Sequence, residues 1–206
     1  MRVKICGITN REDALQAVDA GADALGFILY PGSKRYISPE KAWAIAAELP
    51  PFVQRVAVAV NASVHELEAW RHSAPFDLWQ LHGDESMEFC RGLKGFRLIK
   101  ALGFPVQQQI TPEVYSVSAF LLDKASPQHG GTGESFDWIL GRDFVRTSGK
   151  PCILSGGLTP ENVVQAIQTV RPYAVDVCSG VEAKPGLKDH RKVEEFIALC
   201  QTQSPS

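Results

Sequence analysis

Eight short runs of apolar, often β-branched residues alternate along this chain with longer stretches that have a helical pattern. Each run is bounded by Gly, Pro or polar residues and has the length of a single strand. The expected strands are residues 3–6, 24–29, 55–60, 78–81, 97–101, 119–122, 152–154 and 174–177. Regular alternation of strand and helix is typical of parallel α/β folds.

Each expected strand is followed by an expected helix, at residues 12–20, 39–48, 64–72, 86–93, 105–116, 137–146, 160–170 and 191–201. Ser38 and Thr159 each precede a proline, and this order predicts a capping side chain before the first helical residue. Gly21 predicts the end of the first helix. The first turn, Cys6-Gly7-Ile8-Thr9, lacks the glycine-rich sequence of a doubly wound sheet, so the pattern favours a closed (β/α)8 barrel, the TIM-barrel class of α/β folds.

One domain is expected over residues 1–206, because no linker, repeat or low-complexity run divides the chain. Hydrophobic residues make up 45% and charged residues 21%, which is the composition of a globular protein with a packed core. The last six residues, 201–206, are polar and are expected to fray.

The charge of the chain argues against a nucleic acid or an anionic membrane as partner. Its formal net charge is -2, whereas both partners require concentrated Lys and Arg. No apolar run approaches the roughly 20 residues that cross a bilayer, and the first residues, MRVKICG, do not resemble a signal peptide. A cytoplasmic protein is therefore predicted.

The five cysteines predict neither a disulfide framework nor a CxxC metal site, because they are odd in number and widely spaced. Most are expected to be small buried hydrophobic residues. The histidines lack the spacing of metal ligands, and no metal site is predicted.

In a TIM barrel, catalytic groups lie at the C-terminal ends of the strands and in the loops that follow. These positions carry Cys6, Lys34, Arg35, Asn61, His82, Asp84 and Asp123. Two glycine-bearing turns, Ser155-Gly156-Gly157 and Ser179-Gly180-Val181, follow the seventh and eighth strands. Barrels often bind phosphate between these two loops, so a phosphate site is predicted, with simple tight turns as the alternative.

Four of these side chains have alternative interpretations. Arg35 is suited to pair with a carboxylate or phosphate, but on composition alone a solvated loop arginine is more common. Cys6 and Asp123 together have the chemistry of a base and an acid, although a buried structural thiol and a capping carboxylate are ordinary alternatives. His82 either points into the barrel mouth or caps the next turn.

A series of ordered motifs resembles the phosphoribosylanthranilate isomerase family of tryptophan biosynthesis over almost the whole chain. The motifs are Lys4-Ile5-Cys6-Gly7-Ile8-Thr9, Gly26-Phe27, Ser33-Lys34-Arg35-Tyr36-Ile37, Gln80-Leu81-His82-Gly83, Leu122-Asp123, Gly130-Gly131-Thr132-Gly133, Phe136-Asp137-Trp138, Leu154-Ser155-Gly156-Gly157-Leu158, and Asp176 through Asp189. One departure is Cys178, where serine would be as familiar. The resemblance depends on the combination of motifs in this order.

The resemblance implies an Amadori rearrangement of N-(5-phosphoribosyl)anthranilate that requires no cofactor. Cys6 then matches the general base, Asp123 the general acid and Arg35 the residue that holds the anthranilate carboxylate. Gln80 and His82 are expected to contact the substrate. The phosphate is assigned to the turns after the last two strands, at Gly156, Gly157, Ser179, Gly180 and Val181.

Two other functions stay open at this point. One is another phosphosugar isomerase or epimerase, against which the cysteine after the first strand argues. The other is a catalytically silent barrel that binds a phosphorylated ligand or a partner protein. The only expected partner is a small phosphorylated molecule, a monomer is favoured over a homodimer, and the glycines at 130, 131 and 133 suggest a mobile cover.

Overall fold

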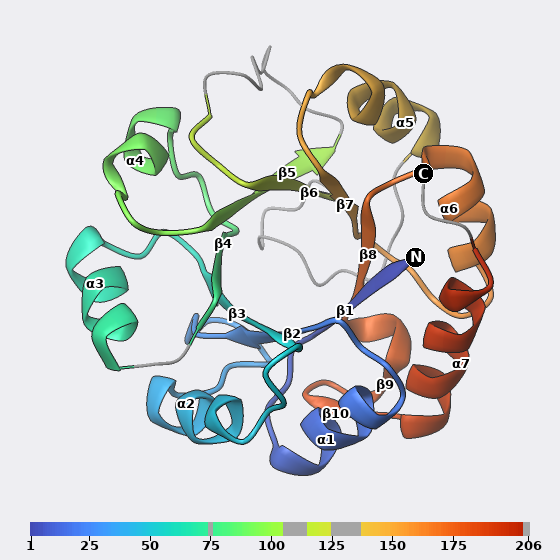
Figure 1. Cartoon of the computed structure of the whole chain (residues 1–206), viewed down its shortest axis with the longest axis horizontal. Helices are drawn as coiled ribbons and strands as arrows, with labels where there is room; N and C mark the ends of the chain where they lie inside the picture. Colours follow the sequence, from blue (N-terminus) through green and yellow to red (C-terminus); the bar gives the residue numbers. More distant parts are fainter. Residues whose placement is uncertain (74–75, 105–114, 125–136, 204–206) are drawn as a thin grey trace.

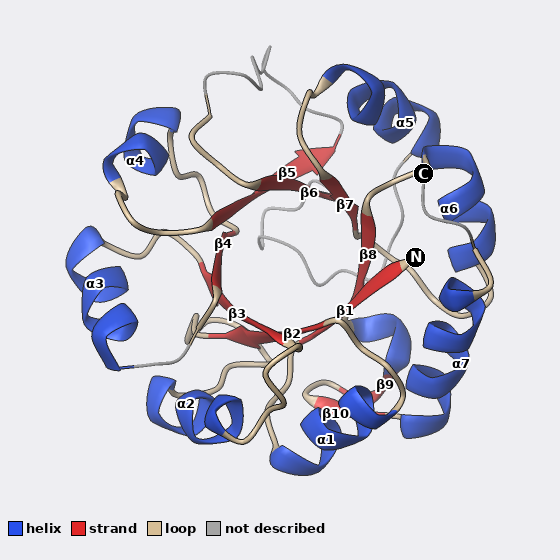
Figure 2. Ribbon diagram, viewed as in Figure 1, coloured by secondary structure: helices blue, strands red, loops and turns tan. Residues whose placement is uncertain are grey.

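The computed structural model describes residues 1–73, 76–104, 115–124 and 137–203. Eight parallel strands close into a barrel in the order β1-β2-β3-β4-β5-β6-β7-β8, which confirms the predicted (β/α)8 class. The strands form an inner ring that the helices surround (Figure 1 and Figure 2). The N-terminus lies at the β1–β8 side of the ring (Figure 1).

The strand predictions are confirmed to within a few residues. The strands are β1 (Arg2–Cys6), β2 (Ala24–Ile28), β3 (Gln54–Ala59), β4 (Leu78–Leu81), β5 (Leu98–Phe104), β6 (Ala119–Lys124), β7 (Cys152–Leu154) and β8 (Ala174–Val177). The barrel closes where β1 pairs with β8 as well as with β2. The largest difference is at β5, which continues three residues beyond its predicted end because it pairs with β6 as far as Lys124.

Seven α-helices lie in the part of the chain that the structure describes. They are α1 (Arg11–Asp19), α2 (Pro39–Ala47), α3 (Val64–Ser73), α4 (Met87–Gly92), α5 (Trp138–Thr147), α6 (Val163–Val170) and α7 (His190–Gln201). Most of the helix expected at residues 105–116 lies outside the described residues, and its last two residues, Tyr115 and Ser116, are not helical. The glycines predicted to form a cover, at 130, 131 and 133, also lie outside the described residues.

The predicted helix boundaries are confirmed at α1 and α2 and wrong at α6. Ser38 caps α2 by accepting the backbone N–H of Lys41, and α1 ends before Gly21, whose φ is 101°. By contrast, α6 starts at Val163 and not at Pro160. The preceding residues form a turn because the Asn162 side chain accepts from Thr159 N and donates to the carbonyl of Gly157.

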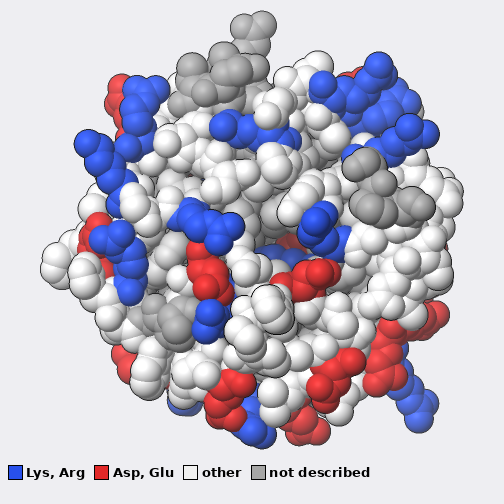
Figure 3. All heavy atoms as spheres, viewed as in Figure 1, with Lys and Arg blue, Asp and Glu red and all other residues white. Residues whose placement is uncertain are grey.

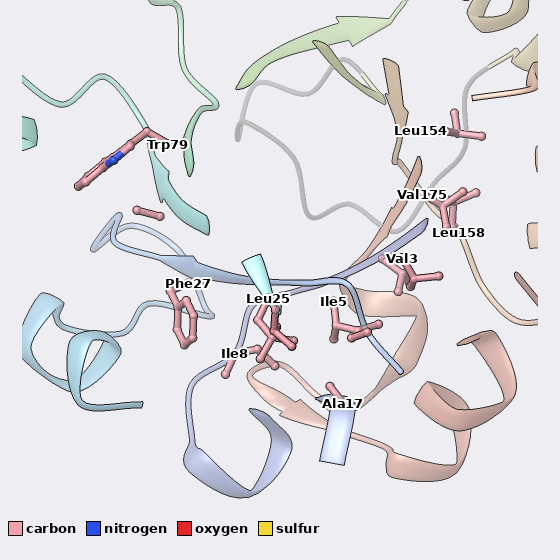
Figure 4. Close-up of a cluster of buried hydrophobic side chains, with 14 of the residues drawn as sticks. Val3, Ile5, Ile8, Ala17, Leu25, Phe27, Trp79, Leu154, Leu158 and Val175 are labelled. Atoms are coloured by element: carbon pink, nitrogen blue, oxygen red, sulfur yellow. The ribbon is translucent and has the colours of Figure 1, made fainter. Parts of the chain in front are cut away.

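The hydrophobic core has two layers that follow the alternation of side chains along each strand. Outward-pointing residues such as Val3, Ile5 and Val175 pack in the layer toward the helices (Figure 4). A smaller cluster fills the barrel interior and contains Val56, Ile99, Ala101, Ala119, Leu121, Ile153 and Ala174. This apolar interior packs the barrel below the strand ends where polar side chains gather.

The tail predicted to fray is held in place as far as the structure describes it. Gln201 ends α7, and the amino group of Met1 donates to the carbonyl of Gln203 at 3.1 Å. Residues 204–206 lie outside the described residues.

A two-residue strand, β10 (Leu187–Lys188), pairs with β9 (Glu182–Lys184) in the segment of the chain between β8 and α7.

Acidic and basic side chains are both spread over the face seen in Figure 3. No helix within residues 1–73, 76–104, 115–124 and 137–203 is long and apolar enough to cross a membrane.

Candidate active site

A cavity of about 320 Å³ lies at the C-terminal ends of the strands. Eight of the residues predicted to form the site line it: Cys6, Arg35, Gln80, His82, Asp123, Gly156, Gly157 and Ser179. Gly180 and Val181 are not among the lining residues, and Val181 is fully buried. The barrel therefore brings most of the predicted site together around one space.

Below Cys6, a buried ion pair crosses from β1 to β8. Lys4 Nζ lies 2.7 Å from Asp176 Oδ1, and each side chain is only 4% exposed. Ser155 donates its hydroxyl to the other Asp176 oxygen at 3.1 Å. Burial opposes the charge of Lys4, but Asp176, with a contribution from Cys6, outweighs this effect and raises the pKa of Lys4, so its side chain is an ammonium group.

The surroundings of Cys6 favour the ionised form of its thiol. Its pKa is lowered from 9.0 to about 6, first by a hydrogen bond from Cys178 and then by the nearby charge of Lys4, against the opposing effect of burial. Gly26 on β2 leaves room for this arrangement, since a Cβ at that position would lie 2.7 Å from Cys6 Sγ and 3.1 Å from Lys4 Nζ. Cys6 is therefore buried, as the structural alternative expected, but it also faces the cavity.

A chain of polar contacts joins β4 to β6. Gln80 Nε2 lies 2.8 Å from His82 Nδ1, and His82 Nε2 lies 3.2 Å from Asp123 Oδ2. The second oxygen of Asp123 accepts the backbone N–H of Lys124 at 2.8 Å. His82 therefore points into the barrel mouth, and Asp123 binds a backbone N–H at the end of β6, neither a helix cap nor a loop bond, while it also lines the cavity.

Arg35 is not a solvated loop residue. Its guanidinium binds Glu182 through Nε and Nη2, with the shortest contact at 2.7 Å, and its side chain is 10% exposed. Glu182 also accepts from Lys188 Nζ at 3.3 Å. Burial opposes the charge of Glu182, but the hydrogen bond from Arg35 and the charge of Lys188 lower its pKa, so the three groups form a charged cluster beside the cavity.

The two glycine-bearing turns require glycine for different reasons. Gly156 and Gly157 have φ angles of 82° and 66°, a backbone conformation that favours glycine. A Cβ on Gly156 would lie 2.9 Å from Asp123 Oδ1, so this glycine lets the seventh turn approach the carboxylate. Gly180 lies in the 3₁₀ turn η2 (Ser179–Val181), where a Cβ would collide with the carbonyl of Leu158.

Among the described residues, no group of three or more His, Cys, Asp or Glu is placed to hold a metal ion. The predictions that the protein uses neither a metal nor a cofactor stay predictions.

Lys4, Asp176 and Glu182 were not predicted as site residues, although each is part of the polar framework of the site. A signal for the first two was present: each is a charged residue inside an otherwise apolar strand, two residues before Cys6 or Cys178. Residues two apart on a strand share a face, so a charge at such a position points into the barrel together with the cysteine. Glu182 offered no comparable signal, because its partner Arg35 is 147 residues away.

The fold and this cavity define an α/β-barrel enzyme with candidate acid–base groups at the strand ends. Residues 3–199 match the family model described as N-(5'-phosphoribosyl)anthranilate (PRA) isomerase. The chain belongs to this family, and it is an isomerase.

The similarity to individual relatives extends over the whole chain. N-(5'-phosphoribosyl)anthranilate isomerase of Pelobacter propionicus is 47% identical, covering 100% of this chain and 99% of the relative. The crystal structure of phosphoribosyl anthranilate isomerase from Thermotoga maritima is 47% identical, with a TM-score of 0.90 and coverage of 98% and 100%. A structure of this isomerase in complex with reduced 1-(o-carboxyphenylamino)-1-deoxyribulose 5-phosphate is 45% identical, with a TM-score of 0.86 and the same coverage.

Proposed function

We propose that this chain converts N-(5-phosphoribosyl)anthranilate to 1-(2-carboxyphenylamino)-1-deoxyribulose 5-phosphate by an Amadori rearrangement, with Cys6 as general base and Asp123 as general acid. The observation that carries the proposal is that these two side chains line one cavity, although they come from β1 and β6. A pentose between them would meet a thiolate on one side and a carboxyl group on the other.

The reaction begins when Asp123 donates a proton to the furanose ring oxygen. The bond between this oxygen and C1′ breaks, and the anilino nitrogen forms an iminium with C1′. The proton is best held on Oδ2 of Asp123, because Oδ1 already accepts the N–H of Lys124. Each proton transfer by a positioned side chain typically contributes about 10²- to 10⁴-fold in rate.

Gln80 and His82 are suited to keep this proton in place. The Oε1 atom of Gln80 is buried and has no hydrogen-bond partner among the described residues. A half-turn of the Gln80 amide gives Oε1 a donor in Nδ1–H of His82 and leaves Nε2 of His82 as an acceptor 3.2 Å from Oδ2 of Asp123. In this arrangement Gln80 and His82 favour a proton on Oδ2 before the substrate binds, and the ring oxygen then replaces His82 as the acceptor of that proton.

In the second step Cys6 removes the proton from C2′. The iminium withdraws electrons from this carbon, and the electron pair of the broken C–H bond forms the enolamine. Tautomerisation then gives the ketone at C2′ and a proton at C1′. A pKa of about 6 means that Cys6 is mainly thiolate at neutral pH, which is the form that a base requires.

The two ends of the substrate have separate anchoring groups in the proposal. Arg35 holds the anthranilate carboxylate, with its guanidinium fixed from behind by Glu182. Gly156, Gly157, Ser179, Gly180 and Val181 hold the phosphate, and Val181 contributes only backbone because its side chain is buried. The related enzyme in complex with a reduced ribulose 5-phosphate compound supports a phosphorylated ligand. Binding energy from these remote groups positions C2′ between Cys6 and Asp123.

Loss of anthranilate fluorescence on incubation with N-(5-phosphoribosyl)anthranilate tests the proposal. With the wild-type chain the anthranilate fluorescence should fall as the substrate is converted. The Cys6→Ser variant should turn over more slowly by orders of magnitude but should still bind the product. Cys90→Ser is the matched control, because Cys90 lies in α4 and does not line the cavity. Full activity in Cys6→Ser would eliminate the proposed base, and an unchanged signal with the wild type would favour a silent binding protein.

The remaining partner predictions are also part of the proposal. We expect a monomer, whereas the related enzyme of Thermotoga maritima is described as dimeric. Light scattering of the purified chain distinguishes the two states. The cytoplasmic location stays a prediction.

A further inference from the structure

Cys6 and Cys178 lie side by side at the ends of two neighbouring strands. The residues just before them, Ile5 and Val177, are partners in the β1–β8 register. Neighbouring strands are about 4.8 Å apart. This spacing falls within the Cα separation of about 4.4–6.8 Å that a disulfide spans.

The side chains of this pair face the same space. Both cysteines line the cavity, and each shifts the pKa of the other, while the Cys178 thiol also lies 4.0 Å from Glu182 Oε1. Because both cysteines line the cavity, a small reagent that enters it reaches both sulfur atoms.

The pair is divided into one thiolate and one thiol. Cys6 is the ionised member, whereas its hydrogen bond to Cys178, together with burial, raises the pKa of the Cys178 thiol. The thiolate is the form that attacks an oxidant, and a neighbouring thiol resolves the product.

The other three cysteines differ from this pair in both position and reactivity. Cys90, Cys152 and Cys200 are buried in α4, β7 and α7, and none lines the cavity. Burial raises the pKa of each of these thiols, to about 12 for Cys200. They serve as internal controls for a reagent that enters the cavity.

We infer that Cys6 and Cys178 form a reversible oxidation site, at which hydrogen peroxide joins the two sulfur atoms as a disulfide and blocks the cavity. In the first step, Cys6 thiolate attacks one peroxide oxygen, the O–O bond breaks, and hydroxide leaves to become water. Cys6 is then a sulfenic acid. The sulfur of Cys178 attacks the sulfur of Cys6, the S–O bond breaks, and a second water leaves with the proton of Cys178. Two thiols are thus oxidised while one peroxide is reduced to two waters.

Oxidation would remove the proposed base of the isomerase, and the loss of activity therefore rests on the proposed function. The formation of the disulfide does not depend on the proposed function. A chain that forms the disulfide but never had isomerase activity would refute the proposed function and leave the oxidation site in place.

The test treats the full chain with hydrogen peroxide, removes the excess with catalase, and measures activity, free thiols and intact mass. We expect the wild type to lose two of its five thiols and two hydrogen atoms from its mass, with activity lost in parallel. Peptide mapping should find Cys6 linked to Cys178, and dithiothreitol should restore both the thiols and the activity.

Two variants make the outcome decisive, after circular dichroism has shown that both are folded. In Cys178→Ser the sulfenic acid of Cys6 has no resolving thiol, so the intact mass of the chain should increase by added oxygen. After long exposure to hydrogen peroxide, dithiothreitol should not restore activity. Cys90→Ala should form the same cross-link as the wild type. The inference is overturned if the wild type gains oxygen without forming the link, links another pair, or does not react, or if Cys178→Ser is inactivated as reversibly as the wild type.

Discussion

On the β1–β8 side of the cavity the charged groups are paired and deeply buried, whereas on the β4–β6 side the polar groups are joined by single contacts and are more open. Lys4 and Asp176 are each 4% exposed, against 16% and 12% for the side chains of His82 and Asp123. The difference shows that the groups on neighbouring strands determine how deeply a polar side chain is buried and whether it has a charged partner.

Removing the proposed acid on the β4–β6 side should reduce activity the most. Asp123→Asn keeps the size of the side chain but cannot donate a carboxyl proton, so kcat should fall by about 10²- to 10⁴-fold. Product binding, measured by fluorescence titration, should change little, because the carboxylate and phosphate anchors are intact. A kcat close to that of the wild type would mean that the two sides do not divide the acid and base roles as proposed.

The next effect concerns the anchor for the substrate carboxylate. Arg35→Lys keeps the charge but loses the planar fork that Glu182 holds in place, so a charge-assisted hydrogen bond of about 1.5–3 kcal/mol should be lost. We expect KM to rise roughly 10- to 100-fold with a smaller change in kcat, measured by steady-state kinetics. A matched loss in kcat with KM unchanged would instead place Arg35 at the reacting atoms.

Lys4→Met tests the charge of the β1–β8 side. The acid limb of the kcat/KM profile should follow the thiolate of Cys6, so wild-type activity should rise with pH through about 6 and then level off. Without the Lys4 ammonium, this limb should move to higher pH, and kcat/KM at pH 6 should fall roughly tenfold. A limb that stays at the wild-type pH would show that Lys4 does not favour the thiolate.

The same variant also leaves Asp176 buried without its partner, and this should lower the free energy of unfolding by about 3–5 kcal/mol. The double variant Lys4→Met/Asp176→Asn is the control, because it removes both charges. It should recover stability in denaturant unfolding, whereas the acid limb should return only part of the way, because the lost charge of Asp176 also raised the pKa of Cys6. If the pH profile returns fully to that of the wild type together with stability, the effect of Lys4 is structural.

The smallest change in kcat is expected at the contact between His82 Nε2 and Asp123 Oδ2, which lie 3.2 Å apart. His82→Ala removes one contact from the proton donor, and a single hydrogen bond contributes about 0.5–1.5 kcal/mol, so kcat should fall several-fold. Gln80→Leu should give a similar loss, and the double variant should lose little more than either single variant, since the two residues act through one chain of contacts. Additive losses would show that they act separately.

The barrel and much of its cavity were predictable because they depend on local patterns. Alternation of apolar and polar residues marks strands and helices, and the barrel places every strand end on one face, so Cys6, His82 and Asp123 could be grouped before any coordinates were known. The start of α6 was predicted wrongly, because the sequence around Thr159 and Pro160 is compatible with both a helix start and a turn. Thr159 and Pro160 have a good helix-start sequence, but hydrogen bonds from Asn162 hold them in a turn instead.

The order of strands and helices, the residue types at the strand ends and the two glycine-bearing turns follow from the amino-acid sequence alone. The interactions between those groups follow from the closed barrel. Lys4 meets Asp176 across 172 residues and Arg35 meets Glu182 across 147, because barrel closure joins the first strands to the last. The ionisation of Cys6 depends on such neighbours and on burial, which are set by the folded chain and not by local sequence.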